Sequence, residues 1–359
     1  MVTHEMIRQL PKVELHDHLD GSMRPQTIIE LARENGVELP EKEPSALADW
    51  FHRGANRKSL SLYLQGFGVT LSVMQRPEAL ERVAEETILD LAEDNVVYVE
   101  VRFAPVLHLS GGMNLEGVVQ AVLRGLEQGR AKTGVEYGLI LCAMRDQTVS
   151  LETAELAVAF RERGVVGFDL AGDEYGHPPK KHLDAFEYIR RQNFNITIHA
   201  GEAFGMESIW QAIQICGAHR IGHATRLVED MVVHGSRIER MGTLADFIRD
   251  KRIPLEMCLS SNVQTGAARS LDEHPFPIYF RNNFRVSLCT DNRLMSETTL
   301  TQEMQLAVKH YNLTLADLEK ITINAMKSAF AHHDDRIRII YDVLKPRFAR
   351  MRSEITSVG

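Results

Sequence analysis

The stretch Tyr137–Met144, YGLILCAM, contains no charged residue. A strand with one face in water alternates apolar and polar residues, whereas a parallel strand buried on both faces is apolar nearly throughout. Similar short runs recur along the chain, and together they predict eight strands. These are expected at Val13–His16, Val96–Ala104, Tyr137–Met144, Val165–Ala171, Ile196–Ala200, Ile221–Ala224, Pro254–Leu259 and Val286–Thr290.

Amphipathic helical patterns separate most of these strands. Pro77 is expected to begin one helix, and Leu151–Arg163 and Met206–Ile215 have the same spacing of apolar residues. Ser22 is expected to cap an earlier helix, which Gly36 would end. Eight strands alternating with helices predict an α/β fold, a closed (β/α)8 TIM barrel. The alternative is a doubly wound open sheet, but no G-x-G-x-x-G loop follows the first strand.

Two regions lie outside this repeat. A helical insertion after the first strand, Ser45–Met74, is interpreted either as additional core or as a lid over the barrel mouth. After the eighth strand, Leu300–Ala331 and Arg336–Met351 are expected to form two or three closing helices. Neither a low-complexity segment nor a long linker interrupts the chain, so residues 1–359 are expected to form one domain.

The chain has 359 residues, a hydrophobic fraction of 44%, a charged fraction of 25% and a net charge of −8. This charge argues against a general nucleic-acid binder, which needs a basic surface, and the basic run Arg336–Arg338 is interpreted as a solvated helix face. No secretory signal and no apolar run long enough to span a bilayer is found, so no membrane association is expected. The scattered cysteines predict buried free thiols and a cytoplasmic location. They are Cys142, Cys216, Cys258 and Cys289.

Polar residues stand where four of the predicted strands end, and this is the face on which barrel enzymes build their active sites. The first strand ends in His16 and His18, which point to the same side because they are two residues apart. His199 ends the fifth strand, His223 the sixth and Asp291 the eighth. One such residue alone is commonly a core histidine or a helix cap. Four sites at the strand ends of one barrel indicate a functional constellation.

Three histidines and one carboxylate, Asp291, suit Zn²⁺, which in catalytic sites keeps a position for water. Bound metal lowers the pKa of that water from about 16 towards about 7. Glu202, three residues beyond His199, can reach a substrate without binding the metal, and His223 is suited to orienting the water or accepting its proton. The fourth strand offers no lysine for a carbamate between two metals, so one zinc ion per chain is expected.

In these positions the sequence resembles the adenosine deaminase family of amidohydrolase-type barrels. The resemblance implies hydrolytic deamination of adenosine or 2′-deoxyadenosine to inosine or 2′-deoxyinosine and ammonia, with a small-molecule nucleoside as substrate. Base deaminases of another fold carry H-x-E and P-C-x-x-C motifs, and that signature is missing here. The matching motifs are His16-Asp17-His18-Leu19-Asp20-Gly21, Asp169-Leu170-Ala171-Gly172-Asp173-Glu174, His199-Ala200-Gly201-Glu202, Gly222-His223-Ala224, Ser260-Ser261-Asn262 with Thr265-Gly266, and Thr290-Asp291-Asn292.

The resemblance also implies roles for individual residues. Glu202 would protonate purine N1, His223 would orient or deprotonate the attacking water, and Asp291 would accept a hydrogen bond from that water. The implied zinc ligands are His16, His18, His199 and Asp291.

Contacts with the substrate are implied for four residues, His18, Asp20, Gly172 and Asn292. The backbone N–H of Gly172 would bind purine N3, and Asp20 would bind the ribose 5′-hydroxyl. Asp20 is alternatively a cap of the following helix. Many family members have aspartate at position 292, where this chain has asparagine, whose amide donates to purine N7 at every pH.

Two alternatives differ in class. The first is deamination of a related 6-aminopurine, either adenine or a 5′-modified adenosine, because the motifs do not identify the 5′ substituent. The second is a metal-free barrel that acts as a scaffold, which is disfavoured because a scaffold has no use for buried titratable groups. The oligomeric state does not follow from the sequence.

Overall fold

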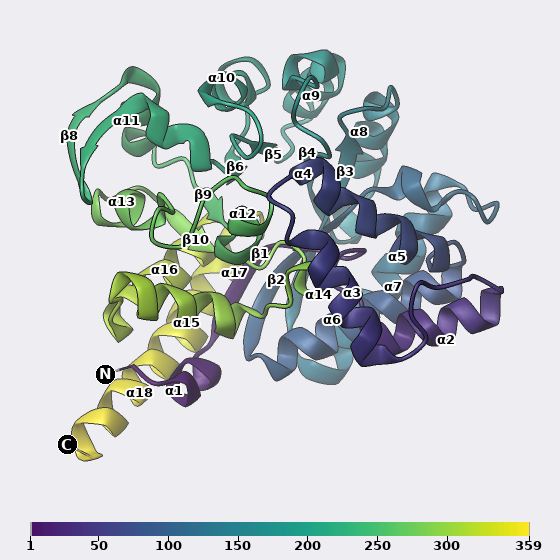
Figure 1. The fold of residues 1–359 in the computed structure, drawn as a ribbon, viewed down its shortest axis with the longest axis horizontal. Coiled ribbons are helices and arrows are strands. Elements are labelled where there is room, and N and C mark those ends of the chain that lie inside the picture. The colour runs from purple at the N-terminus through teal and green to yellow at the C-terminus, as the bar shows by residue number, and fades with distance from the viewer. Residues whose placement is uncertain (1, 359) are drawn as a thin grey trace.

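The computed structural model describes residues 2–358, and eight parallel strands form its centre (Figure 1). They pair in two sheets, in the orders β1-β2-β3-β4 and β10-β9-β6-β5. All eight predicted strands are confirmed, with no end displaced by more than two residues. Their bounds are β1 Lys12–His18, β2 Val96–Phe103, β3 Glu136–Met144, β4 Val165–Ala171, β5 Thr197–Ala200, β6 Arg220–His223, β9 Leu255–Met257 and β10 Val286–Leu288.

Two parallel bridges join the sheets at both edges. Phe168 of β4 pairs with Ile196, and its N–H donates to Asn195 O at 3.0 Å. Asp17 of β1 pairs with Asp291, and the N–H of His18 donates to the carbonyl of Asp291 at 2.8 Å. The eight strands therefore form a ring, so the predicted (β/α)8 barrel is confirmed and the open doubly wound sheet is wrong.

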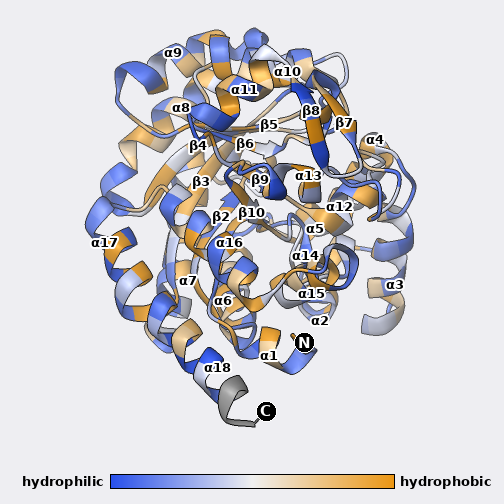
Figure 2. Cartoon of the chain, turned by 90° about the vertical axis from the view of Figure 1, so that its left-hand side faces the viewer, coloured by the Kyte–Doolittle hydropathy of each residue, from blue (hydrophilic) through white to orange (hydrophobic). Residues whose placement is uncertain are grey.

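Helices surround the strands, with hydrophobic residues towards the barrel and hydrophilic residues outwards (Figure 2). Pro77 begins α6 as predicted, and Gly36 follows α2 in the left-handed region at φ +66°. The main helices are α2 Pro25–Asn35, α6 Pro77–Glu93, α7 Leu115–Thr133, α8 Ser150–Ala159, α9 Leu183–Arg191, α10 Met206–Trp210, α11 Thr243–Asp250, α13 Phe276–Arg281, α15 Leu300–Tyr311, α16 Leu315–Ser328, α17 His333–Arg338 and α18 Lys345–Val358. Shorter ones are α1 His4–Gln9, α12 Leu259–Gln264 and α14 Arg293–Ser296.

The predicted cap at Ser22 is wrong. Arg24 occupies the N-cap position of α2 and makes no side-chain capping bond. Ser22 Oγ instead donates to Asp17 Oδ1 at 2.6 Å, because the chain between β1 and α2 turns back over the end of the strand. The closing helices agree with the sequence: α15 and α16 are separate, and α17 continues into α18 through Ile339–Leu344.

Two features lie outside the barrel repeat. The predicted insertion forms α3 Pro44–Ala55, α4 Leu60–Tyr63 and α5 Phe67–Val73. An antiparallel hairpin, β7 Met231–His234 with β8 Arg237–Met241, follows β6 and is absent from the sequence prediction. Its strands are only four and five residues long, and β8 mixes charged with apolar residues, so this stretch resembles a loop in the sequence.

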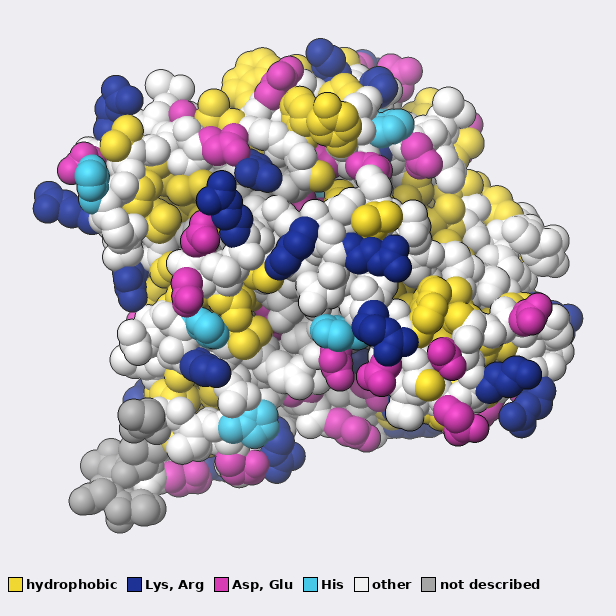
Figure 3. Space-filling model, viewed as in Figure 1, with side chains coloured by type: hydrophobic (Ala, Val, Ile, Leu, Met, Phe, Trp, Pro, Cys, Tyr) yellow, Lys and Arg dark blue, Asp and Glu magenta, His cyan; other side chains and the backbone are white. Residues whose placement is uncertain are grey.

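The remaining sequence predictions concern membrane spans, free cysteines and surface charge. No helix within residues 2–358 is long and apolar enough to cross a bilayer. All four cysteines are buried and free. On the face seen in Figure 3, Lys and Arg side chains are interspersed with acidic and hydrophobic ones and form no continuous basic patch.

Candidate active site

A cavity of about 280 Å³ lies at the carboxyl ends of the strands. Most of the residues predicted for the site line it, and His16 is buried beside it with no exposed surface. The predicted residues in the lining are His18, Asp20, Gly172, His199, Glu202, His223, Asp291 and Asn292. The structure therefore brings the whole predicted constellation together.

The imidazoles of His16 and His18 lie against the carboxylate of Asp291, and the imidazole of His199 lies beside that of His18. His18 Nε2 lies 3.1 Å from His199 Nε2, and Asp291 Oδ1 lies 3.3 Å from His16 Nε2 and 3.4 Å from His18 Nε2. His16 Nε2 has no hydrogen-bond partner within residues 2–358, although it is fully buried. Convergent nitrogen lone pairs repel one another unless a cation lies among them, so this donor set fits a metal ion.

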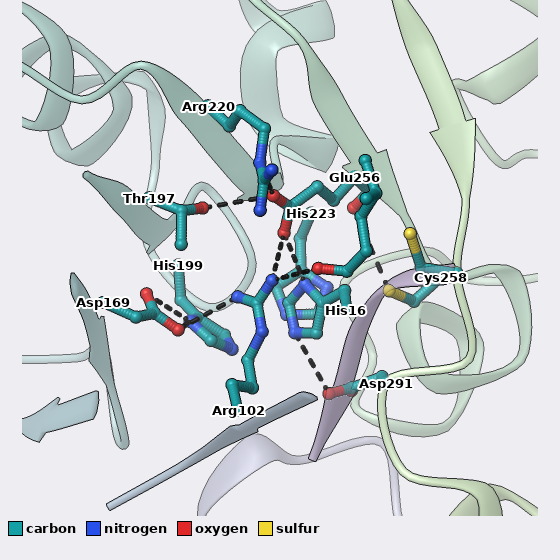
Figure 4. A network of polar contacts seen from close by, with 12 residues as sticks. His16, Arg102, Asp169, Thr197, His199, Arg220, His223, Glu256, Cys258 and Asp291 are labelled. Carbon is teal, nitrogen blue, oxygen red and sulfur yellow. Dashed lines mark hydrogen bonds and ion pairs between the residues drawn. The ribbon is translucent and has the colours of Figure 1, made fainter. Parts of the chain in front are cut away.

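Buried carboxylates hold two of these imidazoles from behind (Figure 4). His16 Nδ1 donates to Glu256 Oε2 at 2.9 Å, and His199 Nδ1 donates to Asp169 Oδ1 at 3.2 Å. A carboxylate on Nδ1 fixes the tautomer that leaves Nε2 free to coordinate. Arg102 donates to Asp169 Oδ2 at 2.9 Å and to Glu256 Oε2 at 2.8 Å, which stabilises both carboxylates as anions.

His223 lies in the same cluster. One ligand atom each from His16, His199, His223 and Asp291 falls within 4.8 Å of the others. His223 Nδ1 lies 2.9 Å from Asn262 Nδ2, so Asn262 can donate to it, and His223 Nε2 lies 3.6 Å from Glu202 Oε2. His223 is thus near the metal position and in contact with the proposed acid.

Glu202 is positioned by another glutamate. The carboxylate of Glu174 accepts four successive backbone N–H bonds, from Gly201 at 2.7 Å, Glu202 at 2.9 Å, Ala203 at 2.7 Å and Phe204 at 2.9 Å. Charge-assisted bonds of this kind hold the loop rigidly. The sequence motif contains Glu174, but nothing in the motif indicates this role.

Burial keeps Glu202 protonated at neutral pH. Desolvation, followed by the nearby charges of Asp291 and Glu174, raises the pKa of Glu202 to about 8. A carboxyl group that is neutral at pH 7 can donate a proton to a substrate.

The residues predicted to contact the substrate are also exposed to the cavity. Asp20 is buried, its Oδ1 has no partner, and burial raises its pKa to about 7. Asp20 does not cap α2, so the cap interpretation is wrong. Asn292 Oδ1 is likewise unpaired, and a Cβ at Gly21 would lie 1.8 Å from it, so only glycine fits there. Gly172, at φ +101°, requires glycine as well.

The insertion covers this cavity. Five apolar or aromatic side chains of the α4–α5 region line it, and Ser61 Oγ donates to Asp173 beyond β4. Tyr63 OH lies 3.0 Å from Ser296 Oγ of α14. The insertion therefore contributes both core and cover, and its movement stays a prediction. The five side chains are Leu60, Tyr63, Leu64, Phe67 and Leu71.

Comparison with known proteins agrees with this site. The family model described as "Adenosine deaminase" matches residues 11–346. The chain belongs to the adenosine deaminase family. Adenosine deaminase 1 of Streptomyces coelicolor is 52% identical over 356 residues, which cover 98% of this chain and 90% of that protein. As a member of this family, the chain is an amidohydrolase-type enzyme.

Two solved structures of other deaminases are similar to this chain in their overall fold. Arabidopsis ADAL, solved in complex with IMP, is 30% identical with a TM-score of 0.82, covering 96% of this chain and 99% of that one. The adenine deaminase of Arthrobacter aurescens has a TM-score of 0.85 and 23% identity, with the same coverage. At that identity the likeness shows the fold alone.

Three buried groups behind the site are missing from the sequence prediction. They are Arg102, Glu256 and the anchoring carboxylate of Glu174. Arg102 and Glu256 are fully buried charges on apolar strands, which is rare unless charges are paired. The signal that could have found them is a charged residue within an apolar strand: Arg102 in β2 (VVYVEVRF) and Glu256 in β9 (LEM).

Proposed function

We propose that the chain hydrolyses adenosine and 2′-deoxyadenosine to inosine and 2′-deoxyinosine with release of ammonia. The observation that carries the proposal is the cluster of three imidazoles and Asp291 in a cavity that also holds a neutral Glu202. The curated relatives bear the name of this activity.

The proposed metal is one Zn²⁺ ion, held by the three imidazoles and one carboxylate found together. Nitrogen and oxygen donors in this number are the usual ligands of catalytic zinc. When bound, the ion would lower the pKa of a coordinated water towards neutrality. The proposed ligands are His16, His18, His199 and Asp291.

The protein groups divide the proton transfers between them. Glu202, neutral at pH 7, gives its proton to purine N1, which makes C6 electrophilic. His223 orients the attacking water or accepts its proton, held by the amide of Asn262. Asp291 accepts a hydrogen bond from the water, and Ser261 Oγ donates to Asp291 Oδ2 at 2.6 Å from the other side.

The other cavity residues bind the rest of the nucleoside. The N–H of Gly172 donates to N3, Asn292 donates to N7, and His18 lies against the base. Asp20, buried with a free Oδ1, accepts the ribose 5′-hydroxyl. The partner of the site is thus a small nucleoside.

The charge of the cavity favours a free 5′-hydroxyl over a phosphate. No lysine or arginine is among its lining residues, whereas Asp20, Asp146 and Asp173 are. Carboxylates without a compensating cation repel a phosphate group. ADAL, by contrast, was solved with the nucleotides IMP and GMP. We therefore place a nucleoside above a 5′-phosphorylated substrate for this chain.

The test is ammonia release from adenosine, 2′-deoxyadenosine, adenine and AMP, compared by kcat/KM on protein whose metal content has been measured. The kcat/KM for each nucleoside should exceed that for adenine and for AMP by at least about 100-fold, because adenine and AMP lose or misplace polar contacts with the buried site. One zinc per chain is expected. Preference for AMP or adenine would contradict the substrate, and two metals per chain would contradict the ligand set. The cytoplasm stays the proposed location, supported by the four free thiols.

A further inference from the structure

A second and larger hollow, of about 800 Å³, lies at the amino ends of the strands. Its lining comes from the segments that lead into β4, β5, β6, β9 and β10, and from the turn between α16 and α17. The length of the barrel strands therefore separates this hollow from the candidate metal ligands, and none of the proposed catalytic residues lines it.

Cations dominate the lining of this hollow. Six lysine and arginine side chains on its wall form no ion pair with any carboxylate among residues 2–358. In a chain of net charge −8, such a concentration of unpaired positive charge is unexpected. Glu162 is the acidic residue on the rim, and it forms no ion pair with them. The six are Arg161, Lys251, Arg252, Arg285, Lys327 and Arg336.

Backbone carbonyls hold several of these guanidinium groups in place. Arg336 Nη1 donates to Lys327 O at 3.0 Å, Arg161 Nη2 donates to Gln192 O at 2.7 Å, and Arg252 Nη1 donates to Asn283 O. A neutral carbonyl fixes the position of a guanidinium without cancelling its charge. These side chains are thus prepositioned cations.

Arg285 lies near two other cations of the wall, Arg252 and Arg336. It is half-buried, and burial, followed by the charges of Arg252 and Arg336, lowers its pKa below the ordinary arginine value. Its Nε, like the Nε of Arg336, is shielded from solvent and has no acceptor. Helix α17 has no buried residue, which agrees with the predicted solvated face: Arg336 is partly exposed, and Arg338 is exposed and pairs with Glu136 at 2.6 Å.

The floor of the hollow contrasts with its wall. Arg220 is fully buried there, but it pairs with Glu100 at 2.5 Å and with Glu256 at 2.6 Å, and Phe330 covers it at 3.7 Å from the ring centroid. Its charge is balanced within the protein. The lysine and arginine side chains of the wall, which form no ion pair among residues 2–358, have charge left for a ligand.

We propose that this hollow binds a multiply charged phosphate anion of nucleotide size, with Arg252, Arg285 and Arg336 as its principal ligands. Guanidinium groups match phosphate oxygens in pairs of parallel hydrogen bonds, and several of them favour an anion that carries more than one charge. The volume lies in the range of small-molecule sites. The phosphate chain of a nucleoside triphosphate and free inorganic polyphosphate share this chemistry.

The experiment is calorimetric titration of the metal-loaded full chain with ATP and, separately, with inorganic tripolyphosphate at physiological ionic strength. We expect saturable binding of one anion per chain that persists in excess inosine, which would occupy the other cavity. Equal affinity for the two probes assigns recognition to the phosphates, and tighter binding of ATP adds the nucleoside. The readout needs no catalysis, so it is independent of the proposed activity.

Arg285→Gln and Arg336→Gln should each weaken binding at least about tenfold, because each removes one charge-assisted contact. Arg285→Lys, which keeps the charge, should weaken it less. The matched control is Arg124→Gln on α7, which makes the same charge change at a side chain paired with Glu81 at 2.9 Å. Absence of saturable binding, equal weakening by the control, or displacement by inosine would overturn the proposal. Unchanged melting temperatures ensure that the variants compared are folded.

Discussion

The two ends of the barrel carry opposite charge. The carboxyl end holds a cavity of about 280 Å³ lined by imidazoles and carboxylates, without a lysine or arginine. The amino end holds a hollow of about 800 Å³ whose wall carries six cations without an ion pair in the described part of the chain. The same strands therefore end in sites suited to different ligands, a metal with a neutral nucleoside at one end and an anion at the other.

Between these ends, buried charges are balanced. Arg102 pairs with Asp169 and Glu256, and Arg220 pairs with Glu256 and Glu100. Taking such charges out of water is costly unless they are paired, so the interior of the barrel tolerates them only in this network. The difference teaches that unbalanced charge, not charge itself, marks a ligand site in this fold.

The largest expected effect comes from removing one metal ligand. His199→Ala should abolish bound metal and essentially all deaminase activity, because one of the convergent Nε2 donors is lost. Metal analysis and ammonia release measure the two losses. The control is His219→Ala at the opposite end, where the histidine lines the hollow. If both variants kept metal and activity, the assignment of the catalytic end would be wrong.

A smaller effect is expected from the proposed acid. Glu202→Gln should lower kcat by about 10²- to 10⁴-fold while the metal stays bound, because the amide cannot donate a proton to N1. In the native enzyme the protonated form is the active one, so kcat/KM should fall as pH rises through the pKa of about 8 and not through that of an ordinary glutamate. The control Glu162→Gln on the rim of the hollow should leave kcat unchanged. Near-normal kcat in Glu202→Gln would assign the proton to another group.

The sequence predicted the barrel and the catalytic cavity because both follow local rules. Apolar runs such as Tyr137–Met144 are typical of buried parallel strands, and the confirmed strand ends carry the polar residues. His16 and His199 could be placed at one face because all parallel strands of a barrel end on the same side. Neither inference requires knowledge of which residues far apart in the sequence are in contact.

What escaped prediction depends on contacts between distant residues. Glu174 meets the backbone of residues 201–204 only because the loops after β4 and β5 fold together. Arg285 and Arg336 are 51 positions apart, and nothing in either neighbourhood indicates that they share a hollow. The cap at Ser22 failed for the same reason, because its hydroxyl finds a tertiary partner in Asp17.

The smallest expected effect tests how the catalytic end recognises the base. Asn292 is buried in the cavity, its Oδ1 has no protein partner, and its neutral amide can donate to N7 at every pH. An adenosine analogue with carbon at position 7 leaves that amide unpaired. This costs about 1–3 kcal/mol, or roughly a tenfold to hundredfold loss of kcat/KM.

The variant Asn292→Asp would instead donate to N7 only while its carboxyl is protonated, so its kcat/KM should fall as pH rises through the pKa of that carboxyl. We would measure kcat/KM against pH for both proteins with adenosine and with the 7-deaza analogue. Superimposable pH profiles for the two proteins, together with an undiminished kcat/KM for the 7-deaza analogue, would show that Asn292 does not contact N7. Selectivity for the base would then rest on Glu202 and Gly172.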